Sequence, residues 1–256
     1  VRPTLEEIEA VEADPEAYSE LVDAFLYDER FLDRIRSMYS EVFLTRQDSY
    51  TVSGWDYGVD DEFLFARSVG DETLRILSTI VDEDLPYTDL VTADWTMANE
   101  ALAAAFPLDY PEGGTGWKKV HYTDARPAAG MLATNSMWWR YMTTASNASR
   151  GKANAVSKIF LCNDYLSKVV SFDRNVNLLD QDALNNALRT NPGCVACHHS
   201  LDPLASFLWG TYYYDYRSPL DLSSYHPERE HLWESTSGVA PAYYGEPGHT
   251  LADLGA

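Results

Sequence analysis

The chain has 256 residues, of which 45% are hydrophobic and 13% are aromatic. This composition is typical of a folded globular protein with one large domain or two small ones. Asp and Glu number 40 against 19 Lys and Arg, which gives a formal net charge of -21 at pH 7. Such a surface repels nucleic acid and attracts basic proteins, and no apolar run is long enough to span a membrane. We therefore expect neither a nucleic-acid partner nor a membrane span.

The first 47 residues predict three helices. Thr4 and Glu7 have the spacing of a capping box, and Asp14 followed by Pro15 predicts an N-cap with proline at the first helical position. A third helix starts at about Glu29, because its apolar residues fall on one stripe. The members of that stripe, which we expect in the core, are Phe31, Leu32, Ile35, Met38, Tyr39, Val42 and Phe43.

The middle of the chain predicts more helices and then a linker. Residues 48–60 contain two glycines and predict a loop or short hairpin. Further helices are expected over 61–69, 71–81 and 88–106. Two prolines and three glycines between residues 107 and 116 form the clearest linker in the chain. We therefore expect a helical domain over 1–110 and a second domain over 117–256.

The second half is less regular. A short strand is expected at 120–122, and helices at 153–166 and 180–190. The aromatic and sulfur-rich stretch 137–142 suits either the wall of a flat cofactor or an ordinary core. Residues 218–256 lack periodicity and predict a loop-rich tail that packs on its own domain or on a neighbouring subunit. The expected fold class is mainly α, with a helical N-terminal bundle, a second helical domain and an irregular C-terminal tail.

A C-x-x-C-H motif follows the helix predicted over 180–190, and it consists of Cys194, Cys197 and His198. With this spacing two thiols attach haem through its vinyl groups while the adjacent imidazole binds the iron. A thioredoxin-like site would need a βαβ pattern, and a zinc site would need a second ligand pair. The sequence provides neither. It therefore predicts one haem c in the second domain, with His198 as the proximal iron ligand.

Three residues around the motif complete this prediction. In many c-type cytochromes a proline carbonyl accepts the other N–H of the proximal histidine, and Pro203 is the residue expected to do so here. His199 should face solvent, because the next position on a helix turns about 100° away from the iron. Cys162 is left without a cysteine partner and is expected to be a small buried apolar residue.

The sixth position of the iron has several candidates. No methionine follows Met142 in the sequence, so the downstream methionine common in small cytochromes c is absent. We expect ligation by two histidines, with His121 or His249 as the distal ligand. The other possibilities are an open position or ligation by His226, His231, Met131, Met137 or Met142. His226 and His231 lie in polar stretches and are expected to be solvated, whereas Met131 suits the core.

The order of these features resembles the planctomycete-type cytochrome c domain family, a group of secreted C-x-x-C-H haem proteins of mostly unassigned role. The matching segments are 2–4 with 17–22, 85–100, 126–132 with 150–152, and 191–204. The resemblance implies a helical, periplasmic or extracellular haem protein that attaches haem through Cys194, Cys197 and His198. The segment after the motif is richer in tyrosine and histidine than is usual for the family, which puts the family's C-terminal features in doubt here.

Three functions are compatible with the sequence. The first is electron transfer by a single haem c, either to a redox partner protein or between haems of neighbouring subunits in a homo-oligomer or filament. The second is a haem enzyme with an open sixth site for peroxide or another small ligand, for which Arg126 and Arg140 are the nearest distal candidates. The third is a structural or assembly module that haem stabilises. Electron transfer requires the fewest additional residues, and no catalytic residue is predicted.

Overall fold

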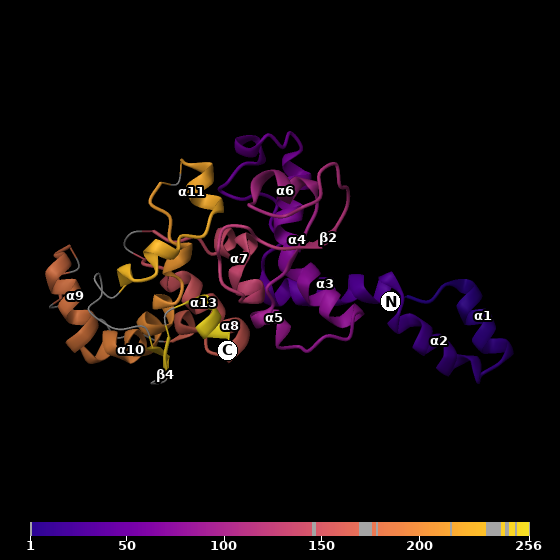
Figure 1. Ribbon diagram of the computed structural model, residues 1–256. Coiled ribbons are helices and arrows are strands. Elements are labelled where there is room, and N and C mark those ends of the chain that lie inside the picture. Colours follow the sequence, from indigo (N-terminus) through magenta and orange to yellow (C-terminus); the bar gives the residue numbers. More distant parts are fainter. Residues whose placement is uncertain are drawn as a thin grey trace.

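The chain forms a mainly helical protein, as predicted, with two small two-stranded sheets in its described part (Figure 1). None of the described helices is both long enough and apolar enough to cross a bilayer. The computed structural model describes residues 2–144, 147–168, 176–177, 179–215, 217–233, 242–243, 246–248 and 250–255.

Three helices form the N-terminal segment, α1 (Leu5–Ala13), α2 (Ala17–Leu26) and α3 (Glu29–Phe43). The capping box of Thr4 and Glu7 is present at the start of α1, which confirms that prediction. The helix expected to start at Pro15 begins two residues later. Neither α1 nor α2 has a buried residue, and in Figure 1 both extend away from the rest of the molecule. We call these two helices the arm.

One continuous helix, α4 (Glu62–Asp82), replaces the two helices expected over 61–69 and 71–81. Glycine lowers helix propensity, but Gly70, the residue between the two expected helices, does not end this helix. In the structure Gly70 is the point where another segment crosses the helix. A Cβ atom at this position would lie 2.9 Å from the Cα of Arg46. The glycine therefore allows close packing and does not end the helix.

A strand interrupts the helix expected over 88–106. The segment forms α5 (Asp89–Thr92), β1 (Thr96–Ala98) and α6 (Glu100–Ala105). Strand β1 pairs antiparallel with β2 (Lys118–Val120), with Thr96 opposite Val120. Thr96 also donates a hydrogen bond of 2.9 Å to the carboxylate of Glu72 on α4. Contacts with distant residues thus hold this stretch extended despite its helical periodicity.

The second half contains α7 (Asn135–Arg140), α8 (Arg150–Leu161), α9 (Gln181–Thr190) and α10 (Pro192–Ser206). Of these later elements, α7 packs on α4, whereas α9 and α10 lie at the end of the molecule away from the arm. The other described elements are short: the 3₁₀ helices η1 (Gly54–Tyr57), η2 (Gly130–Ala133), η3 (Tyr165–Ser167), η4 (Trp209–Thr211) and η5 (Pro227–Arg229), the helices α11 (Pro219–Ser223) and α13 (Leu251–Gly255), and the strands β3 (Ala242–Tyr243) and β4 (Glu246–Pro247).

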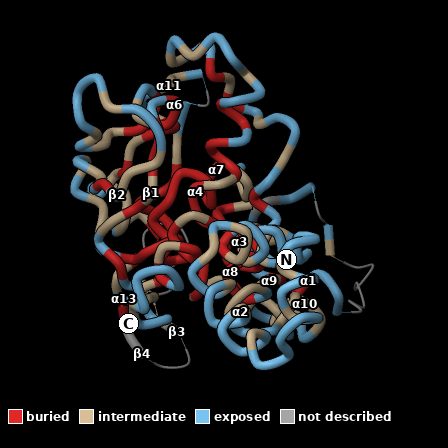
Figure 2. The backbone as a smooth tube through the Cα atoms, turned by 90° about the vertical axis from the view of Figure 1, so that its right-hand side faces the viewer, coloured by how far each residue is buried: buried red, intermediate tan, exposed pale blue. Residues whose placement is uncertain are grey.

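A single hydrophobic cluster joins the two halves of the chain. Figure 2 shows buried residues concentrated around α4 and α7, whereas the arm is largely exposed. The aromatic stretch 137–142 contributes to this core: Trp139 packs against Tyr57, Phe65 and Phe106. In the sequence, the linker at 107–116 comes after β1 and before β2, and these two strands pair with each other. The division into 1–110 and 117–256 stays a prediction, and the two segments share buried contacts.

Glu72 and Lys152 are ionisable side chains buried in the core. Glu72 is fully buried and accepts hydrogen bonds from Thr96 and from the hydroxyl of Tyr122, the latter at 2.5 Å. Burial raises the pKa of the Glu72 carboxyl, although these hydrogen bonds act in the opposite direction. Lys152 on α8 donates to the Thr211 hydroxyl at 2.8 Å and has no carboxylate partner in the described chain. Burial lowers its pKa to about 7.

Candidate functional site

The C-x-x-C-H motif lies in the first half of α10. Asp180 caps α9 by accepting hydrogen bonds from the backbone N–H groups of Asp182 and Ala183, which places the helix where it was predicted. After α9 the chain turns at once into α10. The side chain of Asn191 caps this second helix, and Pro192 occupies its first turn, where a missing N–H costs nothing. The local sequence therefore fixes the start of the helix two residues before Cys194.

The two thiols and the imidazole lie on one side of α10. At 100° per residue, Cys194, Cys197 and His198 fall within the same half of the helix as Leu201 and Ala205, which are buried. Cys194 and Cys197 form no disulfide, and both are partly buried. His199 points to the other side and is exposed, as predicted, with its Nδ1 2.7 Å from the Val195 carbonyl oxygen.

The ring of His198 is held by a carboxylate one helical turn later. Its Nδ1 lies 2.8 Å from an oxygen of Asp202. Both oxygens of Asp202 also accept hydrogen bonds from the guanidinium of Arg150 on α8, at 2.6 and 2.9 Å. Burial alone would raise the pKa of Asp202, but the hydrogen bonds and charges of Arg150 and His198 outweigh it and hold this pKa below its usual value. The Nε2 atom of His198 has no hydrogen-bond partner among the described residues.

Pro203 does not hold His198 in this structure. It lies inside α10, and its carbonyl oxygen accepts a hydrogen bond from the hydroxyl of Ser206. A carbonyl within a helix points along the axis toward the C-terminus, so it faces away from a ring five residues earlier. The role expected of Pro203 is taken by Asp202. The spacing of four residues between His198 and Asp202 was the available signal, since such a pair meets on one helix face.

The distal candidates are not brought to the motif. His121 follows β2, its side chain is 54% exposed, and its Nδ1 lies 3.1 Å from Asp109. Figure 1 places β2 and α10 on opposite sides of α7, so the structure does not bring His121 and His198 together. His249 lies outside the described residues. Met131 and Met137 are buried in the main core, and Met142 lies at its margin.

Two other expectations about single residues are wrong. His226 was expected to be solvated, but its side chain is only 13% exposed. Cys162 was expected to be buried and is exposed; it is the C-cap residue of α8 and has a left-handed conformation (φ 54°). His231 is exposed, as expected.

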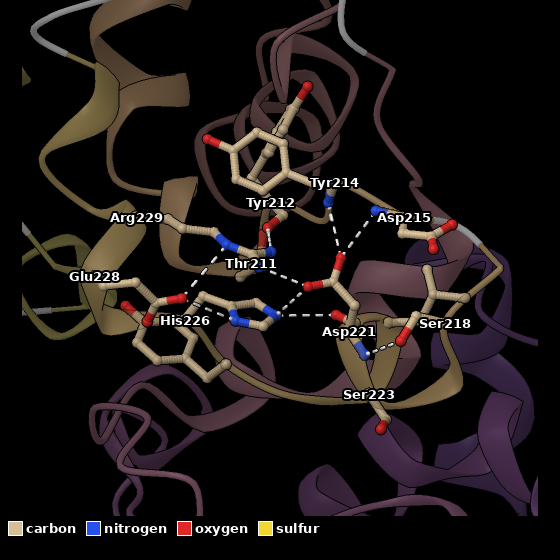
Figure 3. Close-up of polar contacts among 12 residues, drawn as sticks. Thr211, Tyr212, Tyr214, Asp215, Ser218, Asp221, Ser223, His226, Glu228 and Arg229 are labelled. Atoms are coloured by element: carbon tan, nitrogen blue, oxygen red, sulfur yellow. Dashed lines mark hydrogen bonds and ion pairs between the residues drawn. The ribbon is translucent and has the colours of Figure 1, made fainter.

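His226 belongs to a polar cluster centred on Asp221 (Figure 3). One Asp221 oxygen accepts from the guanidinium of Arg229 at 2.5 Å and lies 3.3 Å from Nε2 of His226. The other accepts the backbone N–H groups of Tyr214 and Asp215. Burial opposes ionisation of Asp221, but these donors outweigh it and lower its pKa. The cluster ties the segment that follows α10 to α11, so the described part of the tail packs on its own chain.

Two buried indole groups lie just beyond the C-terminal end of α10. The rings of Trp209 and Trp233 are 5.9 Å apart, and Trp209 stacks on Tyr212 at 4.7 Å. Neither indole N–H has a hydrogen-bond partner within the described ranges of the chain. Buried donors are rarely left unpaired, so these two atoms point to an acceptor that the described polypeptide does not supply.

Among the described residues, no group of three or more His, Cys, Asp and Glu side chains lies close enough to hold a metal ion. No family model matches the chain, and neither the curated proteins nor the solved structures contain a match to it. The resemblance to planctomycete-type cytochrome c domains therefore stays a prediction based on the segments named above.

Proposed function

We propose that this protein is a c-type cytochrome that carries one haem on α10 and transfers electrons outside the cytoplasm. The observation that carries the proposal is the arrangement of Cys194, Cys197 and His198. Two thiols outside any disulfide and one imidazole share a side of the helix, and the Nε2 of that imidazole has no hydrogen-bond partner in the part of the chain that the structure describes. Haem, when bound, supplies a one-electron iron couple.

The residues around α10 suit a haem in three respects. A porphyrin brings four nitrogen ligands of its own, so a single histidine and two thiols are enough to hold it. Each thiol adds across one vinyl group, with a new carbon–sulfur bond at the ring-side carbon and the thiol hydrogen on the terminal carbon. The carboxylate of Asp202 holds the His198 ring at Nδ1, and Nε2 has no hydrogen-bond partner among the described residues.

The charge of the chain suggests the kind of partner. A net charge of -21 favours encounter with a basic redox protein, mainly by raising the association rate. Transfer between haems of a homo-oligomer or filament is part of the same proposal. It is supported by the exposed apolar side chains of Tyr18, Val22 and Leu26, which repeat every four residues along α2. If the measured molar mass is that of a single chain at all protein concentrations, transfer between haems of neighbouring subunits is ruled out.

A haem enzyme with an open sixth site is the second candidate. It is favoured by the position of His121, which lies away from α10. It is disfavoured by the two arginines named as distal groups. Arg126 is buried and forms an ion pair with Asp124, and the Nε of Arg140 donates a hydrogen bond of 2.6 Å to the Leu44 carbonyl oxygen. Both arginines are thus engaged in contacts away from α10.

Expression of the full chain with and without haem-maturation machinery tests the proposal. We expect a red protein whose mass exceeds that of the polypeptide by one haem, and a Cys194→Ser/Cys197→Ser variant that loses the covalent haem. A colourless product in both cases would overturn it.

Carbon monoxide added to the reduced protein separates the two candidates, because a six-coordinate electron carrier resists this ligand whereas an open site binds it. A sulfur-to-iron charge-transfer band in the oxidised spectrum would show that methionine is the distal ligand and would rule out the expected ligation by two histidines.

A further inference from the structure

The carboxylate of Asp202 occupies the place where many c-type cytochromes have a neutral backbone carbonyl. The Nδ1 atom of His198 is 2.8 Å from this carboxylate, and the Pro203 carbonyl is engaged by Ser206. An ionised carboxylate only accepts hydrogen bonds, so the proton of a neutral His198 ring must sit on Nδ1. The Nε2 lone pair then faces away from Asp202, on the side of the ring that would meet an iron atom.

We propose that Asp202, fixed by Arg150, is the positioning residue of His198, and that it makes His198 a stronger donor to iron and lowers the haem potential. This inference rests on the proposed function. A charged acceptor pulls the Nδ1 proton more strongly than a neutral carbonyl does, which raises the basicity of the ring. A more basic ligand stabilises the oxidised iron more than the reduced iron, because the oxidised form carries one more positive charge.

Arg150 is what makes this carboxylate a fixed part of the site. Its guanidinium binds both oxygens of Asp202, and a planar fork of this kind leaves the carboxylate little rotational freedom. Arg150 lies in the first turn of α8, so the orientation of the His198 ring depends on the packing of α8 against α10. The Tyr165 hydroxyl pairs with Ser200 at 2.8 Å and adds a second polar contact to this end of α10.

The test compares Asp202→Asn with the matched variant Asp182→Asn in the haem-loaded full chain. Asparagine keeps one oxygen that can accept the Nδ1 proton and removes the charge, and its NH2 group replaces the oxygen that accepts from the second Arg150 nitrogen. Asp182 is an exposed carboxylate on the neighbouring helix, and its loss controls for the change in net charge. We expect Asp202→Asn to favour reduction by about tenfold in the equilibrium constant, which is about 59 mV for one electron. We expect less than a twofold change for Asp182→Asn. Equal potentials in the two variants would overturn the proposal.

A second measurement keeps the two proposals separable. Nitrogen-15 NMR of His198 in the haem-free full chain, Cys194→Ser/Cys197→Ser, reports which ring nitrogen carries the proton. We expect one tautomer, with the proton on Nδ1, and a mixture of tautomers when Asp202→Ala is added. If no haem attaches to the natural chain, the proposed function fails and this measurement still tests the contact. A tautomer mixture before Asp202 is changed would overturn the positioning role even in a protein that binds haem.

Discussion

The region around α4 and the region around α9 and α10 are built differently. Helix α4 buries most of its length, whereas Ala187 is the one buried residue among the described side chains of α9, and the first half of α10 has none. The second half of α10 packs in the core through Leu201, Leu204 and Ala205, whereas its first half, which carries the motif, is tied to α8 by the polar contact of Arg150 with Asp202. The contrast indicates that buried apolar contacts stabilise the region around α4. The proposed haem would bury further apolar surface on the thiol side of the motif end.

Removal of the proposed haem should change stability the most, and it should affect the two regions unequally. In Cys194→Ser/Cys197→Ser we expect the free energy of local opening at α10 to fall by about 3 kcal/mol or more, because the apolar surface of the attached haem is buried only in the native state. Hydrogen exchange of α10 and α4 peptides, compared with the haem-loaded chain, measures this. If α4 loses as much protection as α10, the two regions do not differ in the way described.

Replacement of Glu72 should destabilise the core region itself. Glu72→Ala leaves the donors Thr96 and Tyr122 buried without an acceptor, and we expect a loss of about 3 kcal/mol in the free energy of unfolding. Glu72→Gln should cost less, because burial raises the pKa of this carboxyl and the amide imitates its neutral form. Urea unfolding measures both. Glu83→Ala, which removes only an exposed ion pair with Lys119, is the control and should cost under about 1 kcal/mol. A control loss equal to that of Glu72→Ala would contradict the prediction.

Lys152 should make stability depend on pH near the boundary between the two regions. Its pKa falls from 10.5 when unfolded to about 7 when folded. The unfolded chain therefore binds more protons between these values, and stability should rise as the pH increases through that window. Below pH 7 the buried ammonium opposes folding, so Lys152→Met should stabilise the protein by roughly 1–3 kcal/mol at pH 6. Urea midpoints at pH 6 and 9 check this, and an equal rise with pH in the methionine variant would argue against it.

Deletion of α1 should have the smallest effect. None of its residues is buried, so we expect removal of residues 2–13 to lower the free energy of unfolding by less than about 1 kcal/mol. Thermal unfolding of the shortened chain gives the value. A large loss would mean that the arm belongs to the core region after all.

Local sequence signals predicted the parts of the fold that depend on local contacts. The capping box at Thr4, the start of α3 at Glu29 and the helix expected over 180–190 agree with the structure, because local contacts decide each of them. The continuity of α4 through Gly70 and the strand β1 were not predicted, because contacts with Arg46 and Glu72, distant in sequence, accompany them. Periodicity contains no information about such partners.

The candidate site divides in the same way. The spacing of Cys194, Cys197 and His198 is itself a chemical pattern, so their common side of α10 could be read from the sequence. The contact of Asp202 with Arg150 joins residues 52 positions apart, which no spacing rule anticipates. His121 was ranked by its apolar neighbours, but those neighbours belong to a strand at the other side of α7.

Between Thr4 and Glu29 the chain carries ten acidic residues and no basic one, and most of this stretch is the arm at the end of the molecule opposite α10. The arm therefore concentrates negative charge at the end of the molecule opposite α10. On a positively charged electrode the protein should adsorb through the arm, so that α10 faces away from the electrode surface. Electron transfer between the electrode and a haem attached to α10 should then be slow. Without the arm the protein should adsorb in other orientations as well, and the current should increase.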